Sequence, residues 1–211
     1  MLPVRHLEEF GRCRFQLAIV LAAAALALGG CDDESAFVVS AVQPYYTTQD
    51  LTTDGALPGA WRLEDEDVTF TFTPAEGNAY NVTVDDKEQD KNFSSRFEGH
   101  LFRLGADSFL DLYPNSVPPG SEFYLLHFFP CHTVARIDFR GDQLEMSFVS
   151  PRWLATQIKA GAVNIAHTNS DEILLLTATT QEMQELLNLN ASDDNAFGEP
   201  LVFERAQEED Q

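Results

Sequence analysis

The sequence predicts a mainly β protein, an antiparallel up-and-down barrel with two short helices near the C-terminus. Apolar and polar residues alternate with a period of two from residue 61 to residue 148, and short turn-rich segments separate the alternating runs. Helical spacing of apolar residues is found only after Pro151. Closing such a meander into a barrel is the simplest arrangement, because closure removes the exposed strand edges.

The first hairpin has the clearest pattern. Large apolar residues alternate with threonine in 68–73, a turn follows at 74–78, and the alternation continues in 80–85. After an acidic turn at 85–91, a longer strand is expected at 93–104. Its central Gly99 suggests a bend or a bulge.

Four more strands follow, and together with the run that begins at Trp61 they make a meander of eight. They are expected at 109–113, 122–129, 133–139 and 144–148. The run 122–129 is apolar on both faces, which suggests a central or covered strand. The triplet Arg140-Gly141-Asp142 lies where a hairpin turn is required, so we interpret it as turn chemistry rather than as an adhesion motif.

The C-terminal part has a different pattern. Trp153, Leu154 and Ile158 have helical spacing in a segment that ends at Gly161. Thr179 and Glu182 have the spacing of a capping box, which predicts a second helix at 180–189. Strands are expected at 173–177 and 201–204, and residues 207–211 form an acidic tail.

The N-terminus has the layout of an export signal. Three arginines precede an apolar run at 15–28, and Gly29 and Gly30 precede Cys31. The run is shorter than the roughly 20 apolar residues that a transmembrane helix needs, which favours cleavage. An ordinary secretory signal with a coincidental cysteine and an uncleaved anchor helix are the alternatives.

Leu28-Gly29-Gly30-Cys31 resembles the lipobox of bacterial lipoproteins. The resemblance implies that residues 1–30 are a signal peptide and that lipidation of Cys31 anchors the protein to a membrane through several acyl chains. Residues 31–56 would then be the lipidated N-terminus and tether. The implied location is the periplasmic side of the cell envelope, at the inner membrane if Asp32 acts as a retention signal and otherwise at the outer membrane.

A second resemblance begins at Gly59-Ala60-Trp61. This tripeptide before an antiparallel meander, with a helix before the last strand and Arg205 at its end, resembles the lipocalin or calycin superfamily. The resemblance implies a barrel domain at 57–206 in which Trp61 closes the base and Arg205 lies across it as a cation–π pair. The helix near Trp153 and the strand at 173–177 depart from the family pattern. The alternative is that Trp61 is a core aromatic residue of another β-fold.

The composition excludes some functions. The 211 residues include 13 Lys and Arg against 34 Asp and Glu, a formal charge of −21, and loss of the leader would leave −22. Nucleic acid is excluded as a partner because phosphate binding needs clustered basic residues. Cys13 would leave with the leader and Cys31 would carry lipid, so Cys131 would have no disulfide partner.

No catalytic or metal site is expected. His127, Cys131 and His132 are residue types that bind zinc, but an extended strand would turn His132 away from the other two. For the same reason Cys131 and His132 do not form a nucleophile–base pair. The acidic segment at 85–90 lacks the spacing of a calcium loop. We therefore expect no metal, no cofactor and no enzymatic activity.

Polar residues within apolar strands are the candidate lining of a ligand cavity. They are His100, Arg103, Asp111, Tyr113, His127 and Arg136. If these side chains point inward, they could orient a small apolar or amphipathic ligand; if they point outward, they are ordinary surface. The expected function is therefore a lipid-anchored envelope protein whose barrel binds such a ligand. The alternative is a non-catalytic structural or interaction lipoprotein, with an envelope protein as partner and a barrel filled by its own side chains, which the 16 phenylalanines favour.

Overall fold

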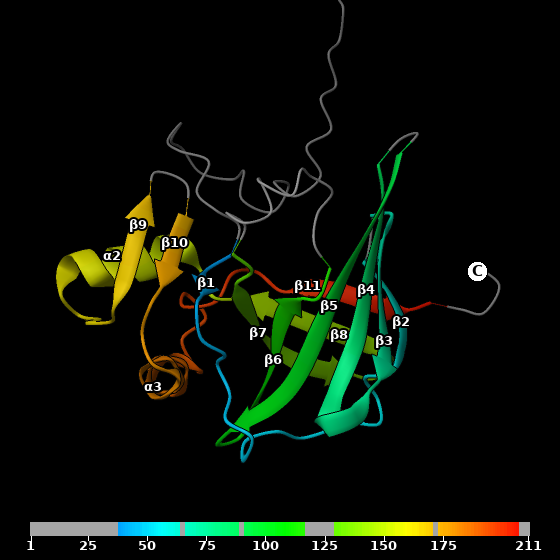
Figure 1. Ribbon diagram of the computed structural model, residues 1–211, viewed down its shortest axis with the longest axis horizontal. Coiled ribbons are helices and arrows are strands. Elements are labelled where there is room, and N and C mark those ends of the chain that lie inside the picture. The colour runs from blue at the N-terminus through cyan, green and yellow to red at the C-terminus, as the bar shows by residue number, and fades with distance from the viewer. Residues whose placement is uncertain (1–37, 64–65, 89–90, 117–128, 171–172, 207–211) are drawn as a thin grey trace, which may run out of the picture. The chain divides into compact units, whose positions relative to one another are not determined.

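Eight antiparallel strands form a closed barrel (Figure 1). The computed structural model describes residues 38–206 apart from 64–65, 89–90, 117–128 and 171–172, and all of these belong to the unit that begins at Asp32. The barrel strands are β2 (Gly59–Leu63), β3 (Val68–Pro74), β4 (Ala79–Glu88), β5 (Lys91–Leu104), β6 (Asp107–Pro114), β7 (His132–Arg140), β8 (Gln143–Phe148) and β11 (Leu201–Arg205). The predicted fold class is confirmed.

The order of the strands around the barrel is β6-β5-β4-β3-β2-β11-β8-β7, and a direct pairing of β6 with β7 closes it. The eighth barrel strand is thus β11, which lies between β8 and β2, and not the expected strand at 122–129. Apart from Phe129, that stretch lies outside the described residues. The alternation within 122–129 is a local feature, so it could not show that the strand between β8 and β2 comes from the C-terminal end of the chain.

Gly99 is needed for close packing and not for a bulge. The ladder from β4 to β5 runs without interruption through the pair Tyr80 and Gly99, and Gly99 also pairs with Leu112 of β6. Of the two alternatives expected at Gly99, a bend or a bulge, the bulge is therefore absent from this ladder. A Cβ atom at Gly99 would lie 2.8 Å from Cγ2 of Val82, a distance too short for two carbon atoms.

The turn between β7 and β8 agrees with the prediction, whereas the turn between β4 and β5 is shorter than predicted. Gly141 and Asp142 connect β7 to β8 as expected, and Gly141 has a φ of 65°, which glycine adopts without strain. The acidic turn expected at 85–91 is mostly strand, because Asp85 and Asp86 pair with Ser94 and Phe93 in a longer hairpin.

Three short strands extend the sheet from β7. They are β1 (Ser40–Ala41), β10 (Ile173–Leu176) and β9 (His167–Ser170). β10 was expected, whereas β9, a run of polar residues without alternation, was not. A short 3₁₀ helix, η1 (Glu76–Asn78), connects β3 to β4.

The two expected helices are present. The helix α2 (Pro151–Ala160) begins after Ser150, whose side chain accepts a hydrogen bond from the Trp153 N–H, and it ends at Gly161. The helix α3 (Thr180–Asn190) begins with the predicted capping box. Met183, Leu186 and Leu187 of α3 are buried.

The barrel wall separates two hydrophobic cores. The inner core fills the barrel and includes Trp61, Phe72, Leu101, Leu110 and Phe203. The outer core lies between the outer face of β5, β6 and β7 and the added strands and helices; its members include Phe102, Phe109, Val134, Leu176 and Met183. Neighbouring residues of one strand thus belong to different cores, as strand alternation requires.

Residues 42–58, here called the strap, connect the two edges of this wall. At one end the Val42 N–H donates to the Leu176 carbonyl oxygen of β10. At the other end Leu51 pairs with Phe102, and the Thr52 N–H donates to the carbonyl oxygen of Leu101 of β5. The strap therefore crosses the outer face of β5, β6 and β7.

Candidate functional site

The structure brings part of the predicted set together, on the outer face of the barrel wall. His100 of β5 pairs with Asp111 of β6, and Asp111 pairs with Val134 of β7, which belongs to the outer core. Both polar residues are buried, His100 with 8 % and Asp111 with 0 % of their surface exposed. They lie under the strap and do not line the barrel interior.

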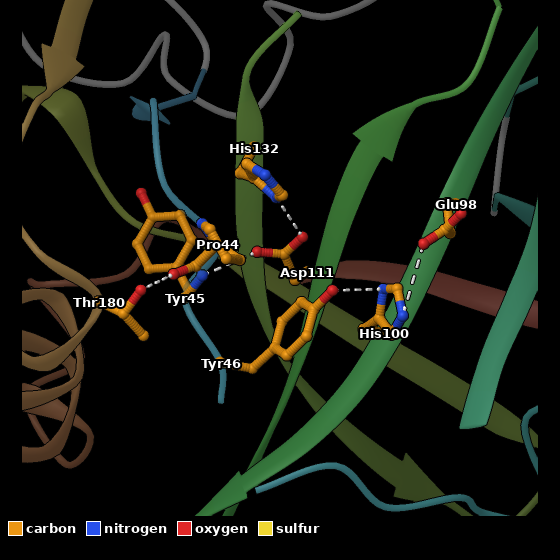
Figure 2. Close-up of polar contacts among 8 residues, drawn as sticks. All are labelled: Pro44, Tyr45, Tyr46, Glu98, His100, Asp111, His132 and Thr180. Carbon is orange, nitrogen blue, oxygen red and sulfur yellow. Dashed lines mark hydrogen bonds and ion pairs between the residues drawn. The ribbon is translucent and has the colours of Figure 1, made fainter. Parts of the chain in front are cut away.

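Asp111 is the centre of a buried polar network (Figure 2). One carboxylate oxygen accepts a hydrogen bond of 3.1 Å from the Tyr45 backbone N–H, and the other lies 2.8 Å from Nδ1 of His132. Because a carboxylate can only accept, Nδ1 of His132 is the donor. The His132 ring also packs against Tyr113, with 4.5 Å between the ring centres. Charge-assisted hydrogen bonds of this kind are strong when they are shielded from water.

A second pair of side chains extends the network along the strap. The Tyr46 hydroxyl and Nδ1 of His100 are 3.0 Å apart, and the two rings stack at 4.5 Å. Nε2 of His100 lies 3.5 Å from Glu98. Burial lowers the pKa of His100, although Glu98 and Asp111 oppose this. His100 is therefore held mainly in its neutral form at neutral pH.

The strap tyrosines have raised pKa values. Burial, with the nearby Asp111 carboxylate, raises the pKa of Tyr46 to about 12. Burial and Asp111 also raise the pKa of Tyr45, whose hydroxyl is buried. Both phenols are therefore neutral under physiological conditions, and the network holds the strap to the wall by hydrogen bonds rather than by phenolate charge.

The other predicted residues lie apart from this network. Arg136 of β7 packs its guanidinium 4.6 Å from the centre of the Phe197 ring and donates to the Ala191 carbonyl oxygen. Arg103 is exposed on β5. His127 and Cys31 lie outside the described residues.

Sequence reasoning missed His132, Tyr45 and Tyr46 as partners of Asp111. The alternation in β7 places His132 on the same face as Val134, and Tyr45-Tyr46 is the only aromatic pair in a stretch without periodicity. These are the signals that could have indicated the contact. Which strand lies beside β7 could not be read from them.

The network has the geometry of a clamp. Within the described residues, the hydrogen-bond partner of the His132 ring is the Asp111 carboxylate. Burial raises the pKa of the Cys131 thiol, whose Sγ lies 3.7 Å from the Phe129 carbonyl oxygen. Among the described residues, no group of three or more His, Cys, Asp or Glu side chains is placed to hold a metal ion.

Trp61 and Arg205 form a second site at the end of β11. Cζ of Arg205 lies 4.2 Å from the centre of the Trp61 ring, and Trp61 is 1 % exposed. The guanidinium donates to the carbonyl oxygens of Ala56 and Pro58, and Trp61 Nε1–H donates to that of Leu57 at 2.8 Å. The end of the strap is thereby tied to β2 and β11.

The fold and these two sites define the class of protein as a closed, eight-stranded antiparallel β-barrel. Comparison with protein-family models, with curated proteins and with solved structures found no match for the chain. Neither helix in the described part of the chain combines the length and the apolar character needed to cross a bilayer.

Proposed function

We propose that this chain is a lipid-anchored envelope protein with a lipocalin-like barrel that binds a small apolar or amphipathic ligand without catalysing a reaction. The observation that carries the ligand-binding part is a rim of half-buried apolar side chains on the inner face of the barrel: Val68, Phe70, Val84 and Phe97. They are continuous with the inner core. The Trp61–Arg205 stack supports the lipocalin-like assignment.

The rim differs from the rest of the interior in its exposure. Phe72, Val82 and Leu101, further along the same strands, are at most 2 % exposed, whereas the rim residues keep part of their surface accessible. Covering apolar surface contributes roughly 25 cal/mol per Å². A ligand with an apolar segment would gain free energy by covering the rim, and a polar group on it could stay in water.

Lipid attachment rests on the Leu28-Gly29-Gly30-Cys31 sequence. The nine residues from Asp32 to Ser40 can span at most about 30 Å, so a lipid at Cys31 would hold β1 within that distance of the membrane. Mass spectrometry of the protein from membranes should find Cys31 acylated and N-terminal. Metabolic labelling with a fatty acid should disappear in Cys31→Ser. An unmodified Cys31 thiol would contradict the anchor.

The ligand proposal is tested with a fluorescent hydrophobic probe, anilinonaphthalene sulfonate, and the purified domain. We expect saturable fluorescence enhancement, reduced at least fivefold by Phe97→Gln. The control is Leu189→Gln, which removes a side chain that is 82 % exposed on α3. Both variants should keep the far-ultraviolet circular dichroism of the wild type. Equal enhancement by the two variants would rule out the rim as the binding surface.

The second candidate is a structural or interaction protein that meets another envelope protein. It is favoured by the side chains that fill the inner core, including Trp61, Phe72 and Phe203, each at most 1 % exposed. These leave an apolar ligand little space deep in the barrel. If the wild type binds no probe while remaining folded, this candidate replaces the first.

A further inference from the structure

The barrel wall is open where β6 stops pairing with β7. Their ladder ends at the pair Ser108 and Ile137, but β7 continues to Arg140. In the described ladder Asp138, Phe139 and Arg140 pair with β8 alone, so this edge of β7 is free of a strand partner. A cleft of about 490 Å³ lies at the opening. Its volume is within the range of small-molecule sites.

Arg103 lines this cleft and makes no ion pair with another described residue. It lies on β5 opposite Ser108, which also lines the cleft. Within the described residues its guanidinium makes no ion pair, hydrogen bond or ring contact. The chain has 34 acidic and 13 basic residues, so an arginine without an ion pair is unusual in it. A guanidinium of this kind in a cleft favours the binding of an anionic group. Carboxylates match its planar array of donors.

The two other arginines of the cleft are already engaged. Arg140 lies 3.5 Å from Asp138 and 3.2 Å from Glu145. Arg136 donates to the Ala191 carbonyl oxygen and lies 3.8 Å from Asp194. Arg103 is therefore the cation left for a ligand.

The remaining charges of the cleft select against a purely anionic ligand. Asp54 and Asp107 also line it, and the lining as a whole carries three arginines and four carboxylates. A dianion such as phosphate would be repelled by this excess of negative charge. A molecule that carries both a carboxylate and an ammonium group matches both signs.

We propose that this cleft binds a short zwitterionic peptide. Its C-terminal carboxylate binds the Arg103 guanidinium, its backbone pairs with the open edge of β7 at Phe139, and its N-terminal ammonium lies near Asp54 and Asp107. An open strand edge offers backbone hydrogen bonds to a peptide, and capture of a terminal carboxylate adds specificity for its end. The site is separate from the apolar rim and does not depend on lipid attachment.

Calorimetric titration of the purified domain with trialanine tests the ligand class. We expect saturable binding with one site per chain. The C-terminal amide of trialanine and the N-acetylated peptide each remove one charge, and each should bind at least tenfold more weakly. Absence of saturable trialanine binding, or equal binding of either blocked peptide, would overturn the proposal.

Two arginine variants test the location. Arg103→Gln should weaken trialanine binding at least tenfold, whereas Arg96→Gln, an exposed arginine on the same strand outside the cleft, should leave it unchanged. Equal affinity of Arg103→Gln and the wild type would also overturn the proposal. Because neither variant alters Phe97 or the rest of the rim, loss of peptide binding with retained probe binding separates this site from the proposed function.

Discussion

Cζ of Arg205 lies 4.2 Å above the centre of the Trp61 ring. The contact joins the last barrel strand to the first, since Arg205 and Trp61 are also paired in the ladder between β11 and β2. Gly59 leaves room for it, because a Cβ atom there would lie 2.8 Å from Nη1 of Arg205. The Arg205 side chain thus adds a contact between the first and the last strand of the barrel.

Replacing this arginine should destabilise the barrel. Arg205→Ala removes the stack on Trp61 and the hydrogen bonds to Ala56 and Pro58, and we expect the free energy of unfolding to fall by about 1–2 kcal/mol. Urea denaturation followed by Trp fluorescence measures this change. The control is Arg62→Ala, an exposed arginine on β2, which should change stability by less than about 0.5 kcal/mol. Equal effects of the two changes would contradict the role of the stack.

Removing the central carboxylate of the clamp should release the strap. Asp111→Ala leaves the Tyr45 N–H and the His132 ring without their hydrogen-bond acceptor. We expect the free energy of unfolding to fall by about 3 kcal/mol. Limited proteolysis should then cut the strap faster than in the wild type. Asp138→Asn, an exposed carboxylate on β7, is the control. Unchanged cleavage of the strap in Asp111→Ala would show that Asp111 does not hold it.

Gly99→Ala should be destabilising because of Val82. The added methyl group would lie 2.8 Å from Cγ2 of Val82, and overpacking of this kind costs about 1–3 kcal/mol. In a Val82→Ala background the same change should cost clearly less, because the clashing atom is gone. Urea midpoints of the four proteins of this cycle measure the coupling. Strictly additive effects would mean that the clash is relieved elsewhere.

Stability should depend on pH through His100. Its pKa in the folded protein lies below the ordinary value of 6.5 because burial disfavours the charged ring; His132 adds to this effect, and Glu98 and Asp111 oppose it. The unfolded chain therefore binds a proton more readily. The contribution of neutral His100 to the free energy of unfolding is fully present above about pH 6.5. It is lost as the pH falls toward the pKa of His100 in the folded protein.

Urea midpoints between about pH 7.5 and pH 5.5 measure this dependence. The decline should be smaller in His100→Gln than in the wild type, and His167→Gln, which changes an exposed histidine, should leave it as in the wild type. A nuclear magnetic resonance titration should also place the His100 pKa below the ordinary histidine value of 6.5. The same slope in all three proteins would show that His100 does not contribute.

Local features predicted much of the fold correctly. The hairpin of β3 and β4 follows from the alternation of Phe and Val with Thr, the turn before β8 follows from Gly141, and α3 begins at its capping box of Thr179 and Glu182. Each signal lies within a few residues of the structure it specifies. The close packing at Gly99 could not be predicted from local features, because Val82, the residue it packs against, is on another strand.

The candidate site was harder to predict for the same reason. His100 and Asp111 were singled out as polar residues in apolar strands, but alternation alone does not say which face of a strand is inside when both faces are apolar. The strap covers the outer face, so Asp111 is buried outside the barrel with Tyr45 and His132. These partners lie 66 and 21 residues away in the chain.

The amino-acid sequence by itself determined the β class, most hairpins, both helices and the acidic charge, because periodicity, turn residues and helix caps act between near neighbours. Only the tertiary structure decided that β11 closes the barrel, that the strap crosses its wall and that Arg103 faces an open cleft. Those outcomes depend on which distant segments compete for the same strand edge and the same apolar surface, and that competition is settled only when the whole chain packs.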